Sequence, residues 1–494
     1  MNFKRQSGIL LHPTSLPGDH GIGTIGKEAF DFIDFLSVSG QKLWQILPLG
    51  PTGFGESPYQ CFSSIAGNPL LISLERLEAE GLLGASDIAD HTGKYARHVD
   101  FKRIRKEKTL LLNKAFRSFK KYINDHNDFN TFCSLNSAWL DDFSLYLALK
   151  EEFRYKAWNA WPKAVKFRDS ETLEMYSEKL KDKILYHKFV QYTFFKQWKE
   201  LKNYARKKNI SIVGDIPLYV AYDSVDAWTK PENFLFDTEG RPVQVSGVPP
   251  DYFSATGQLW GNPVYNWEYL EKDGFSWWIE RIKACLELYD IIRIDHFRGL
   301  SAFWSIPYGE KTAVNGTWVN ASGKKLFKTL IHELGEIPII AEDLGVITPD
   351  VEALRDGFGF PGMKILQFAF DAKEDNNYLP HTYTENCVVY TGTHDNNTSL
   401  GWYENASSAD KKKFKEYIDG YIDEGPARAM IRLAWASVAN IAIVPLQDVL
   451  ELGAQARMNM PGTLSKNWIW KYRPGDLTAK HAVWLKNLTE TYGR

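Results

Sequence analysis

The chain has 494 residues, with 59 Lys and Arg against 61 Asp and Glu, and its net charge of −2 gives no basic surface for nucleic acid or for an anionic membrane. No window approaches the ~18 consecutive apolar residues of a membrane span, and the apolar run after Lys4 and Arg5 is too short to be the apolar core of a signal peptide. We therefore expect a cytoplasmic protein with a polar or neutral small substrate and with no nucleic-acid or membrane partner.

Eight short apolar runs, separated by helical patterns, are predicted to be β-strands. They are Gly8–Leu11, Leu43–Leu47, Ile212–Asp215, Ile291–Asp295, Ile339–Glu342, Lys364–Phe368, Val388–Thr391 and Ile441–Pro445. Apolar runs without alternation are typical of parallel strands covered on both faces, and an α/β barrel needs eight of them. The sequence therefore predicts an α/β fold, a (β/α)8 TIM barrel that forms a single domain over residues 1–494.

Large insertions are expected because the chain far exceeds the roughly 250 residues of a plain barrel. Residues 50–210, after the second strand, are predicted to form a mostly helical subdomain, since apolar residues recur three or four positions apart between Leu185 and Leu201. A second insertion, 217–290, follows the third strand and ends in a predicted helix, Phe275–Tyr289. It contains the segment 247–267, whose glycines, prolines and aromatic residues predict an ordered loop.

Three of the predicted strands deliver an acidic residue at their carboxyl ends, namely Asp295, Glu342 and Asp395. The C-terminal face of such a barrel carries the active site, so these three residues are candidates for one shared cleft. Taken alone, an acidic residue at a strand end is more often a helix N-cap or a loop hydrogen-bonder. The recurrence on three strands favours a catalytic cleft.

The types of acidic residue suit the cleavage of a glycosidic bond. Cleavage with retention needs a carboxylate nucleophile and a carboxylic acid about 5 to 5.5 Å apart. Asp295 is short and held by a strand end, which suits the nucleophile, whereas the longer Glu342 can reach the leaving oxygen. Arg293 is expected to keep Asp295 ionised, and Glu342 needs a pKa raised by burial or by neighbouring carboxylates. The 17 Trp and 24 Tyr residues also suit a cleft that stacks on sugars.

Several longer motifs follow one another along the chain. They are Gly8–Pro17, Trp44–Pro51, Ser57–Gln60, Gly214–Pro217, Gly247–Phe253, Trp260–Pro263 and the three acidic segments. In order and spacing the chain resembles the 4-alpha-glucanotransferases called amylomaltases or disproportionating enzymes, glycoside hydrolase family 77. The resemblance runs from Ser7 to the region of Trp470 and is least distinctive in the helical insertion.

This resemblance implies a retaining enzyme that moves a segment of a 1,4-alpha-glucan to the 4-hydroxyl of an acceptor through a covalent glycosyl-enzyme. It implies Asp295 as nucleophile, Glu342 as general acid and base, and Asp395 as the residue that holds the ring hydroxyls of the sugar. The residues that it implies for substrate binding are Ser57, Tyr59, Asp215, Tyr252, Phe253, Trp260, Arg293, His296, His394 and Asn467. The alternatives are a turn for Asp215 and structural roles for His296 and Asn467.

The implied donors are alpha-1,4-glucans and maltooligosaccharides, and the implied acceptors are glucose or maltooligosaccharides. Transfer requires that water be kept out, a role that the resemblance gives to Tyr252, Phe253 and Trp260. No nucleotide fingerprint or metal-ligand spacing occurs in the sequence, so no cofactor and no metal are expected. The four cysteines lie far apart without a CxxC pair and are expected to be reduced thiols.

Two other classes of protein are also compatible with these sequence features. An α-amylase-type hydrolase would act on the same bonds with the same acidic residues, because water can resolve the glycosyl-enzyme as well as a sugar hydroxyl can. A non-catalytic glucan-binding protein is the third reading, although pure binding has no use for three acidic residues at strand ends.

Overall fold

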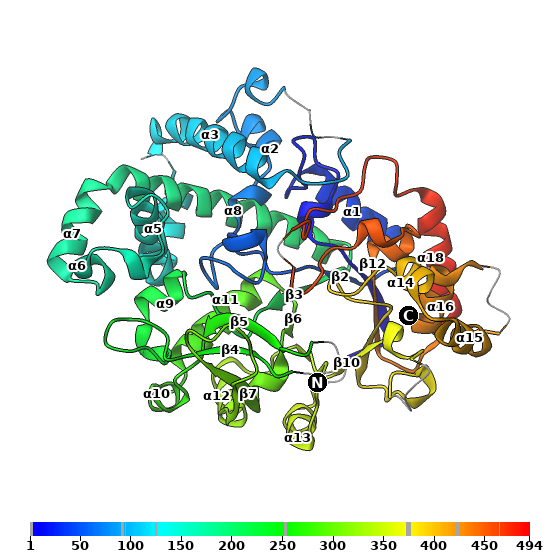
Figure 1. Ribbon diagram of the computed structural model, residues 1–494. Helices are drawn as coiled ribbons and strands as arrows, with labels where there is room; N and C mark the ends of the chain where they lie inside the picture. Colours follow the sequence, from blue (N-terminus) through cyan, green and yellow to red (C-terminus); the bar gives the residue numbers. More distant parts are fainter. Residues whose placement is uncertain are drawn as a thin grey trace.

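A barrel of parallel strands occupies the middle of the molecule in the computed structural model (Figure 1). The structure describes residues 3–89, 93, 95–123, 126–250, 254–371, 377–419, 424–463 and 465–494. The helices between the second and third barrel strands lie to one side of the barrel, and the helices of the last 100 or so residues lie on the opposite side.

Eight parallel strands form the barrel and are hydrogen-bonded in the order β10-β11-β12-β1-β2-β3-β6-β9. They are β1 (Gln6–Leu10), β2 (Leu43–Gln45), β3 (Ser211–Ile216), β6 (Ile291–Ile294), β9 (Ile339–Ala341), β10 (Gly362–Ile365), β11 (Cys387–Tyr390) and β12 (Ile441–Pro445). The ring closes between β9 and β10, where the Ala341 N–H donates to the Pro361 carbonyl at 3.0 Å. The predicted (β/α)8 barrel is confirmed.

All eight predicted strands are present; the eighth has the predicted bounds, six others differ by one or two residues at one or both ends, and the sixth differs most. The strand β10 begins at Gly362 and ends at Ile365, so the prediction of Lys364–Phe368 was wrong at both ends. Leu366–Phe368 instead form a 3-10 turn. Leu366 is fully buried in that turn, and an apolar run alone does not distinguish a buried strand from a buried turn.

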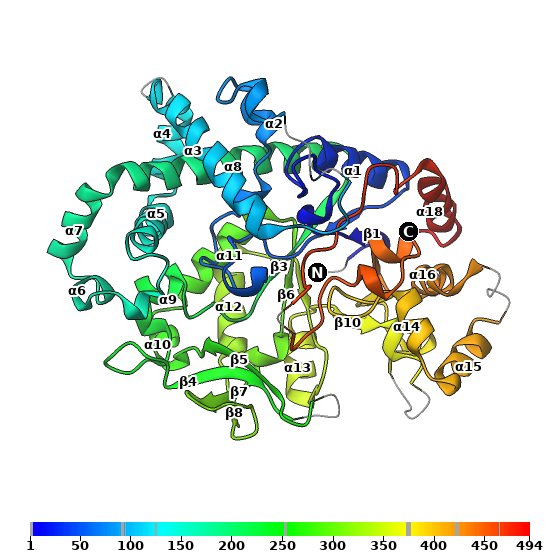
Figure 2. The same ribbon diagram turned by 45° about the horizontal axis from the view of Figure 1, so that its top comes forward.

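The segment between β2 and β3 is helical. Its helices are α2 (Leu74–Ala79), α3 (Phe101–Lys120), α4 (Asn127–Leu135), α5 (Ser137–Glu152), α6 (Lys163–Lys166), α7 (Ser170–Lys179) and α8 (Lys181–Lys207). The longest of these, α8, runs across this part of the molecule (Figure 2) and buries Phe189, Trp198 and Leu201, which belong to the predicted apolar stripe. The helical character of the segment is confirmed, and the bounds of a separate subdomain stay a prediction.

A second sheet, antiparallel and ordered β5-β4-β7-β8, stands beside the barrel. Its strands are β4 (Gln244–Val248), β5 (Gln258–Pro263), β7 (Ala302–Pro307) and β8 (Thr317–Asn320). The segment 247–267 was predicted as a loop, and this was wrong in part, because it contains the end of β4 and all of β5. These strands are short and contain Gly, Ser and Pro, so they carry a weak strand signal.

The helices outside this segment cover the barrel and its loops. They are α1 (Lys27–Val38), α9 (Val225–Thr229), α10 (Trp267–Lys272), α11 (Ser276–Leu288), α12 (Gly323–Leu334), α13 (Pro349–Gly357), α14 (Ser399–Asn405), α15 (Ser408–Tyr417), α16 (Pro426–Ala436), α17 (Leu446–Val449) and α18 (Ala479–Thr491). The helix predicted before β6 is confirmed as α11, which is shorter by one residue at each end. Over the described residues, every helix is too short or too polar to cross a lipid bilayer.

Candidate active site

Asp295 and Glu342 lie side by side at the C-terminal ends of two paired strands. Ile294, the last residue of β6, pairs with Ala341, the last residue of β9, so the two acidic residues come next on neighbouring strands. Such strands lie about 4.8 Å apart, and the Glu342 N–H donates to the Ile294 carbonyl at 3.1 Å. Asp395 lies on the loop that follows β11. All three predicted acidic residues are therefore at the same end of the barrel.

Arg293 bridges two carboxylates inside the barrel. Asp215 on β3 is the direct register partner of Arg293 on β6, and Asp295 lies two residues further on the same strand face. The Arg293 Nη1 donates to both carboxylate oxygens of Asp215 at 2.7 Å and to Asp295 Oδ1 at 3.1 Å. The side chains of Asp215 and Arg293 are buried, so this ion pair is shielded from solvent.

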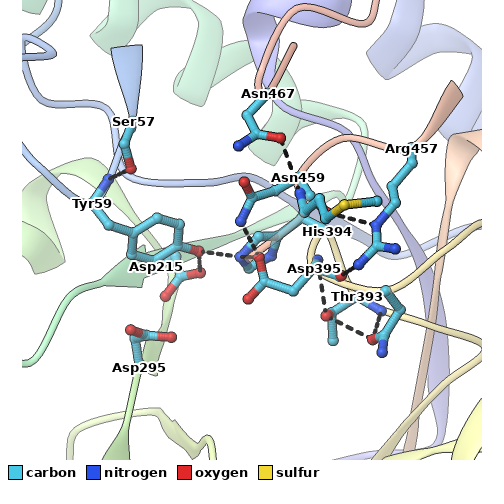
Figure 3. Close-up of polar contacts among 12 residues, drawn as sticks. Ser57, Tyr59, Asp215, Asp295, Thr393, His394, Asp395, Arg457, Asn459 and Asn467 are labelled. Atoms are coloured by element: carbon cyan, nitrogen blue, oxygen red, sulfur yellow. Dashed lines mark hydrogen bonds and ion pairs between the residues drawn. The ribbon is translucent and has the colours of Figure 1, made fainter. Parts of the chain in front are cut away.

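Tyr59 links the buried ion pair to the loop that carries Asp395 (Figure 3). Its hydroxyl donates to Asp215 Oδ2 at 2.7 Å and lies 2.9 Å from His394 Nε2. Burial lowers the pKa of His394, so its imidazole is neutral. Because the single Tyr59 proton goes to Asp215, the proton of the neutral imidazole is assigned to Nε2, which donates to the Tyr59 oxygen. The two rings stack with centroids 5.2 Å apart.

Asp395 is held by two residues, Arg457 and Asn459, to which the sequence analysis assigned no role. The Asn459 side-chain amide donates to Asp395 Oδ1 at 2.6 Å, and the Arg457 guanidinium donates to the Asp395 backbone carbonyl at 2.5 Å. Both residues lie on a loop near the end of the chain, where an Asn or an Arg has no periodic pattern to mark it.

Glu342 is oriented by backbone N–H groups. His296, directly after Asp295, adopts the left-handed conformation with φ 52°, and its N–H donates to Glu342 Oε2 at 2.6 Å. The Trp260 ring stands edge-on to the His296 ring with centroids 4.7 Å apart. Among the described residues the buried His296 Nε2 has no hydrogen-bond partner. Burial lowers the pKa of His296 to about 3, so this imidazole is neutral and has one nitrogen available to a ligand.

The two neighbouring carboxyl groups differ in proton affinity. Burial raises the pKa of Glu342 well above its ordinary value, Arg293 lowers it, and the charge of Asp295 raises it. Burial raises the pKa of Asp295 to about 7, Arg293 lowers it, and Asp215 and Asp395 raise it. The Asp295 side chain is 30 % exposed to the cleft, so water there limits the effect of burial. Glu342 is therefore the group that holds a proton at neutral pH.

Arg293 lowers the pKa of Asp295, as predicted, but the lowering is smaller than the prediction requires. Its charge does favour the ionised form of Asp295, but burial outweighs it. The physical reason is that Arg293 also neutralises Asp215, with which it makes the shorter contacts.

Ser57 and Asn467, two further predicted binding residues, make their hydrogen bonds to nearby protein groups. The Ser57 hydroxyl accepts the Tyr59 N–H at 3.2 Å, and the Asn467 amide is bonded within its own loop, to Met460 and Thr463. Substrate contact by Ser57 and Asn467 stays a prediction. Tyr252 and Phe253 lie outside the described residues.

The thiols and the acidic residues offer no evident metal site in the described part of the chain. The four cysteines are free thiols. No group of three or more His, Cys, Asp or Glu side chains among the described residues is placed to hold a metal ion.

Comparison with known proteins connects this geometry to a family. The family model described as 4-alpha-glucanotransferase, of glycoside hydrolase family 77, matches residues 11–478. The chain belongs to glycoside hydrolase family 77. A 4-alpha-glucanotransferase from Synechocystis is 52 % identical, covering 99 % of this chain and 98 % of the relative, and one from Clostridium butyricum is 50 % identical, covering 98 % and 100 %.

A solved amylomaltase structure has the same fold over its whole length. It is an amylomaltase from Streptococcus agalactiae in complex with acarbose, 44 % identical, with a TM-score of 0.96 over 99 % of this chain and 100 % of the other. Family 77 enzymes are retaining transglycosylases, and this chain is accordingly an enzyme that transfers alpha-1,4-glucan segments with retention.

Proposed function

We propose that Asp295 is the nucleophile and Glu342 the general acid and base of the glucan transfer. The observation that carries this proposal is the position of the two carboxyl groups at neighbouring strand ends, with Glu342 the stronger holder of a proton. A proton on Glu342 and a charge on Asp295 are the states that the first chemical step needs.

In that step an Asp295 carboxylate oxygen forms a bond to the anomeric carbon while the bond from this carbon to the leaving oxygen breaks. The Glu342 proton moves to the leaving oxygen, so the shortened glucan departs as a neutral alcohol. In the second step Glu342 takes the proton of an acceptor 4-hydroxyl, whose oxygen attacks the anomeric carbon and displaces Asp295. Two inversions at one carbon give net retention.

Around this pair we assign sugar-binding roles to Asp395, His394 and His296. Asp395 is 44 % exposed on its side chain, which leaves it open to the ring hydroxyls of a bound sugar. His394 lies beside it, with Nε2 3.4 Å from Asp395 Oδ1. The unpartnered His296 nitrogen suits a second hydroxyl. Trp260 packs against His296 and is proposed to restrict water on this side, with Tyr252 and Phe253 as further candidates.

The proposed donors are alpha-1,4-glucans and maltooligosaccharides, and the proposed acceptors are glucose and maltooligosaccharides. That the Streptococcus agalactiae amylomaltase was solved in complex with acarbose supports a glucan-like ligand for this chain. A cytoplasmic location and a part in glycogen, starch or maltodextrin metabolism stay predictions.

The experiment that tests transfer is incubation of the purified protein with maltotriose, followed by separation of products by chain length over time. Transfer predicts a ladder of longer oligomers together with free glucose and little gain in total reducing ends. Steady growth of reducing ends without longer products would make the protein a hydrolase of the α-amylase type, and an unchanged substrate would favour the binding-protein alternative.

The same assay tests the nucleophile through Asp295→Asn, which keeps the shape of the side chain and removes its charge. Turnover is expected to fall by about three orders of magnitude or more, because a covalent step is lost. A variant that retains more than about a tenth of the wild-type turnover would rule out Asp295 as the nucleophile.

A further inference from the structure

The segment after the 3-10 turn Ala454–Ala456 passes beside Asp395 and is fastened to it at several points. We call residues 457–460 the strap. Figure 3 shows Arg457 and Asn459 reaching Asp395 from the side away from Asp295 in that view. The Asn459 N–H also donates to the His394 carbonyl at 3.0 Å. The strap thus contacts both residues of the His394-Asp395 pair.

The hydrogen bonds of the strap act on different parts of Asp395. Arg457 holds the backbone, since its Nη2 donates to the Asp395 carbonyl and its Nε donates to the Asn459 carbonyl at 2.7 Å. Asn459 holds the side chain, since its amide donates to Oδ1 at 2.6 Å. Over the described residues, the hydrogen bond from Asn459 and the contact with His394 both involve Oδ1 of this carboxylate. The other oxygen, Oδ2, is therefore available to a sugar.

The strap is itself held in place by its own loop. The Met460 N–H donates to Asn467 Oδ1 at 3.0 Å, and the Trp468 N–H donates to the Met458 carbonyl at 2.7 Å. Trp468 is buried and packs on the rings of Tyr59 and His394 with centroids 5.9 Å away in both cases. These contacts fix the backbone on both sides of Asn459, which suits this residue to hold the position of a partner side chain.

We propose that Asn459 is a positioning residue for the transfer reaction, which fixes the rotamer of Asp395 so that Oδ2 meets the ring hydroxyls of the donor sugar. Arg457 sets the backbone from which Asp395 projects. The inference rests on the sugar-binding role proposed for Asp395. Asn459 itself reaches the substrate only through Asp395, so its loss misplaces one carboxylate and leaves Asp295 and Glu342 where they are.

The test compares Asn459→Ala, Asn459→Asp and a matched control, Thr463→Ala, in steady-state transfer from maltotriose. Thr463 is exposed on the same loop; its hydroxyl donates to the Met460 carbonyl at 2.7 Å and accepts from the Asn467 amide at 3.1 Å, without touching Asp395, so Thr463→Ala removes contacts within the loop and keeps the contact between Asn459 and Asp395. Asn459→Ala is expected to lower kcat about 10- to 100-fold with KM changed less than about threefold, because a misplacement of about 1 Å has effects of this size. Asn459→Asp replaces the donor by a negative charge beside Asp395 and is expected to lower kcat further. The kcat of Thr463→Ala is expected to stay within about twofold of the wild-type value.

A double-mutant cycle with Asp395→Asn separates this inference from the proposed function. If Asn459 acts through Asp395, then Asn459→Ala has little further effect on kcat in the Asp395→Asn background. A full additional loss there, an Asn459→Ala kcat equal to the wild-type value, or an equal loss in Thr463→Ala would each overturn the positioning role. An Asp395→Asn variant with wild-type kcat would instead remove the role proposed for Asp395, and the inference with it.

Discussion

At the scale of single residues, Asp295 and Glu342 show how two carboxyl groups on adjacent strands acquire different proton affinities. Asp295 shares the Arg293 guanidinium with Asp215 and is partly open to the cleft. Glu342 is buried and lies beside the charge of Asp295, and both effects raise its pKa, whereas Arg293 and the His296 N–H that donates to it lower it. The environments therefore separate the pKa values of two chemically similar groups, which is how acid and base roles are usually divided.

The raised pKa of Glu342 predicts that Glu342→Gln stabilises the fold at neutral pH while abolishing transfer. The folded state holds the Glu342 proton more tightly than the unfolded chain, so between the two pKa values stability falls by about 1.4 kcal/mol per pH unit as pH rises. Glutamine removes this loss. Since a chain of 494 residues shifts by about 1 °C per kcal/mol, we expect the midpoint to rise by about 3 to 4 °C near pH 7.5.

Scanning calorimetry at about pH 4 and about pH 7.5 checks this prediction. At the lower pH both forms carry a neutral side chain, and the difference should vanish. The exposed Glu174 on α7 provides the control, because Glu174→Gln should show no such pH-dependent gain. A Glu342→Gln protein that melts no higher than wild type near pH 7.5 would contradict the prediction.

Replacement of Arg293 should move the acid limb of the pH profile. Asp295 must be ionised to attack, and Arg293 lowers its pKa, so the acid limb of kcat/KM lies at or below about pH 7. In Arg293→Met the limb is expected to move to higher pH by about 1 unit or more. Arg293→Lys keeps the positive charge and should move it less. The measurement is kcat/KM against pH for all three proteins, and identical acid limbs would show that Arg293 does not tune this group.

From strand patterns the sequence predicted the site residues on or directly after barrel strands, and from longer motifs it predicted loop residues such as Tyr59 and Asp395, but it assigned no role to Arg457 or Asn459. Asp215, Arg293 and Asp295 follow from the apolar runs that contain or precede them, because the period of a strand fixes which residues share a face. Asn459 follows from nothing local, since its role depends on a loop that returns to Asp395 from 64 positions away in the sequence.

At the scale of elements, the barrel strands were predictable and the second sheet was not. Each barrel strand is a short run of buried apolar residues, which is visible in the sequence itself. The second sheet depends on the pairing of Gly247 with Trp304, which joins the segment after β3 to the segment after β6, and on the pairing of Trp304 with Trp318 within the latter segment. Such strands are specified by their cross-strand partners rather than by their own composition.

The strand β5 of this sheet places Trp260 over His296, and Trp260→Ala should raise hydrolysis relative to transfer. Removal of the ring opens one side of the glycosyl-enzyme to water, which is present at about 55 M in bulk. We expect the ratio of hydrolysis to transfer on maltotriose to rise about tenfold. The ratio is measured from new reducing ends against longer oligomers, with Val243→Ala, an exposed residue before β4, as the control. An unchanged ratio in Trp260→Ala would exclude a water-restricting role.

At the scale of the whole molecule, two arginines far apart in the sequence fasten the same helix end. Arg5 donates to the carbonyls of Trp435 and Ser437 at 2.8 Å, and Arg494 donates to the Trp435 carbonyl at 2.8 Å. The last carbonyls of α16 have no partners within the helix, so the guanidinium groups supply them.

Loss of this contact should lower stability without lowering turnover. Arg5→Met removes several donors from carbonyls near the start of β12, and a loss of about 1 to 3 kcal/mol is expected. For a chain of 494 residues this corresponds to a fall of about 1 to 3 °C in the unfolding midpoint. Lys4→Met, at an exposed neighbouring position, is the control for the thermal scan. Equal midpoints for Arg5→Met and wild type would show that the carbonyls find water instead.

The pairing of β1 with β12, in which Gln6 meets Ile441, also sets the timing of folding in a cell. At a synthesis rate of roughly 5 to 20 residues per second, β1 has left the ribosome roughly 20 to 90 seconds before its partner is made. During that interval an apolar strand edge stands open to other nascent chains. A protein of this topology is therefore expected to depend on chaperones during translation more than on thermodynamic stability afterwards, and slower synthesis of the region before β12 would lengthen its exposure to aggregation.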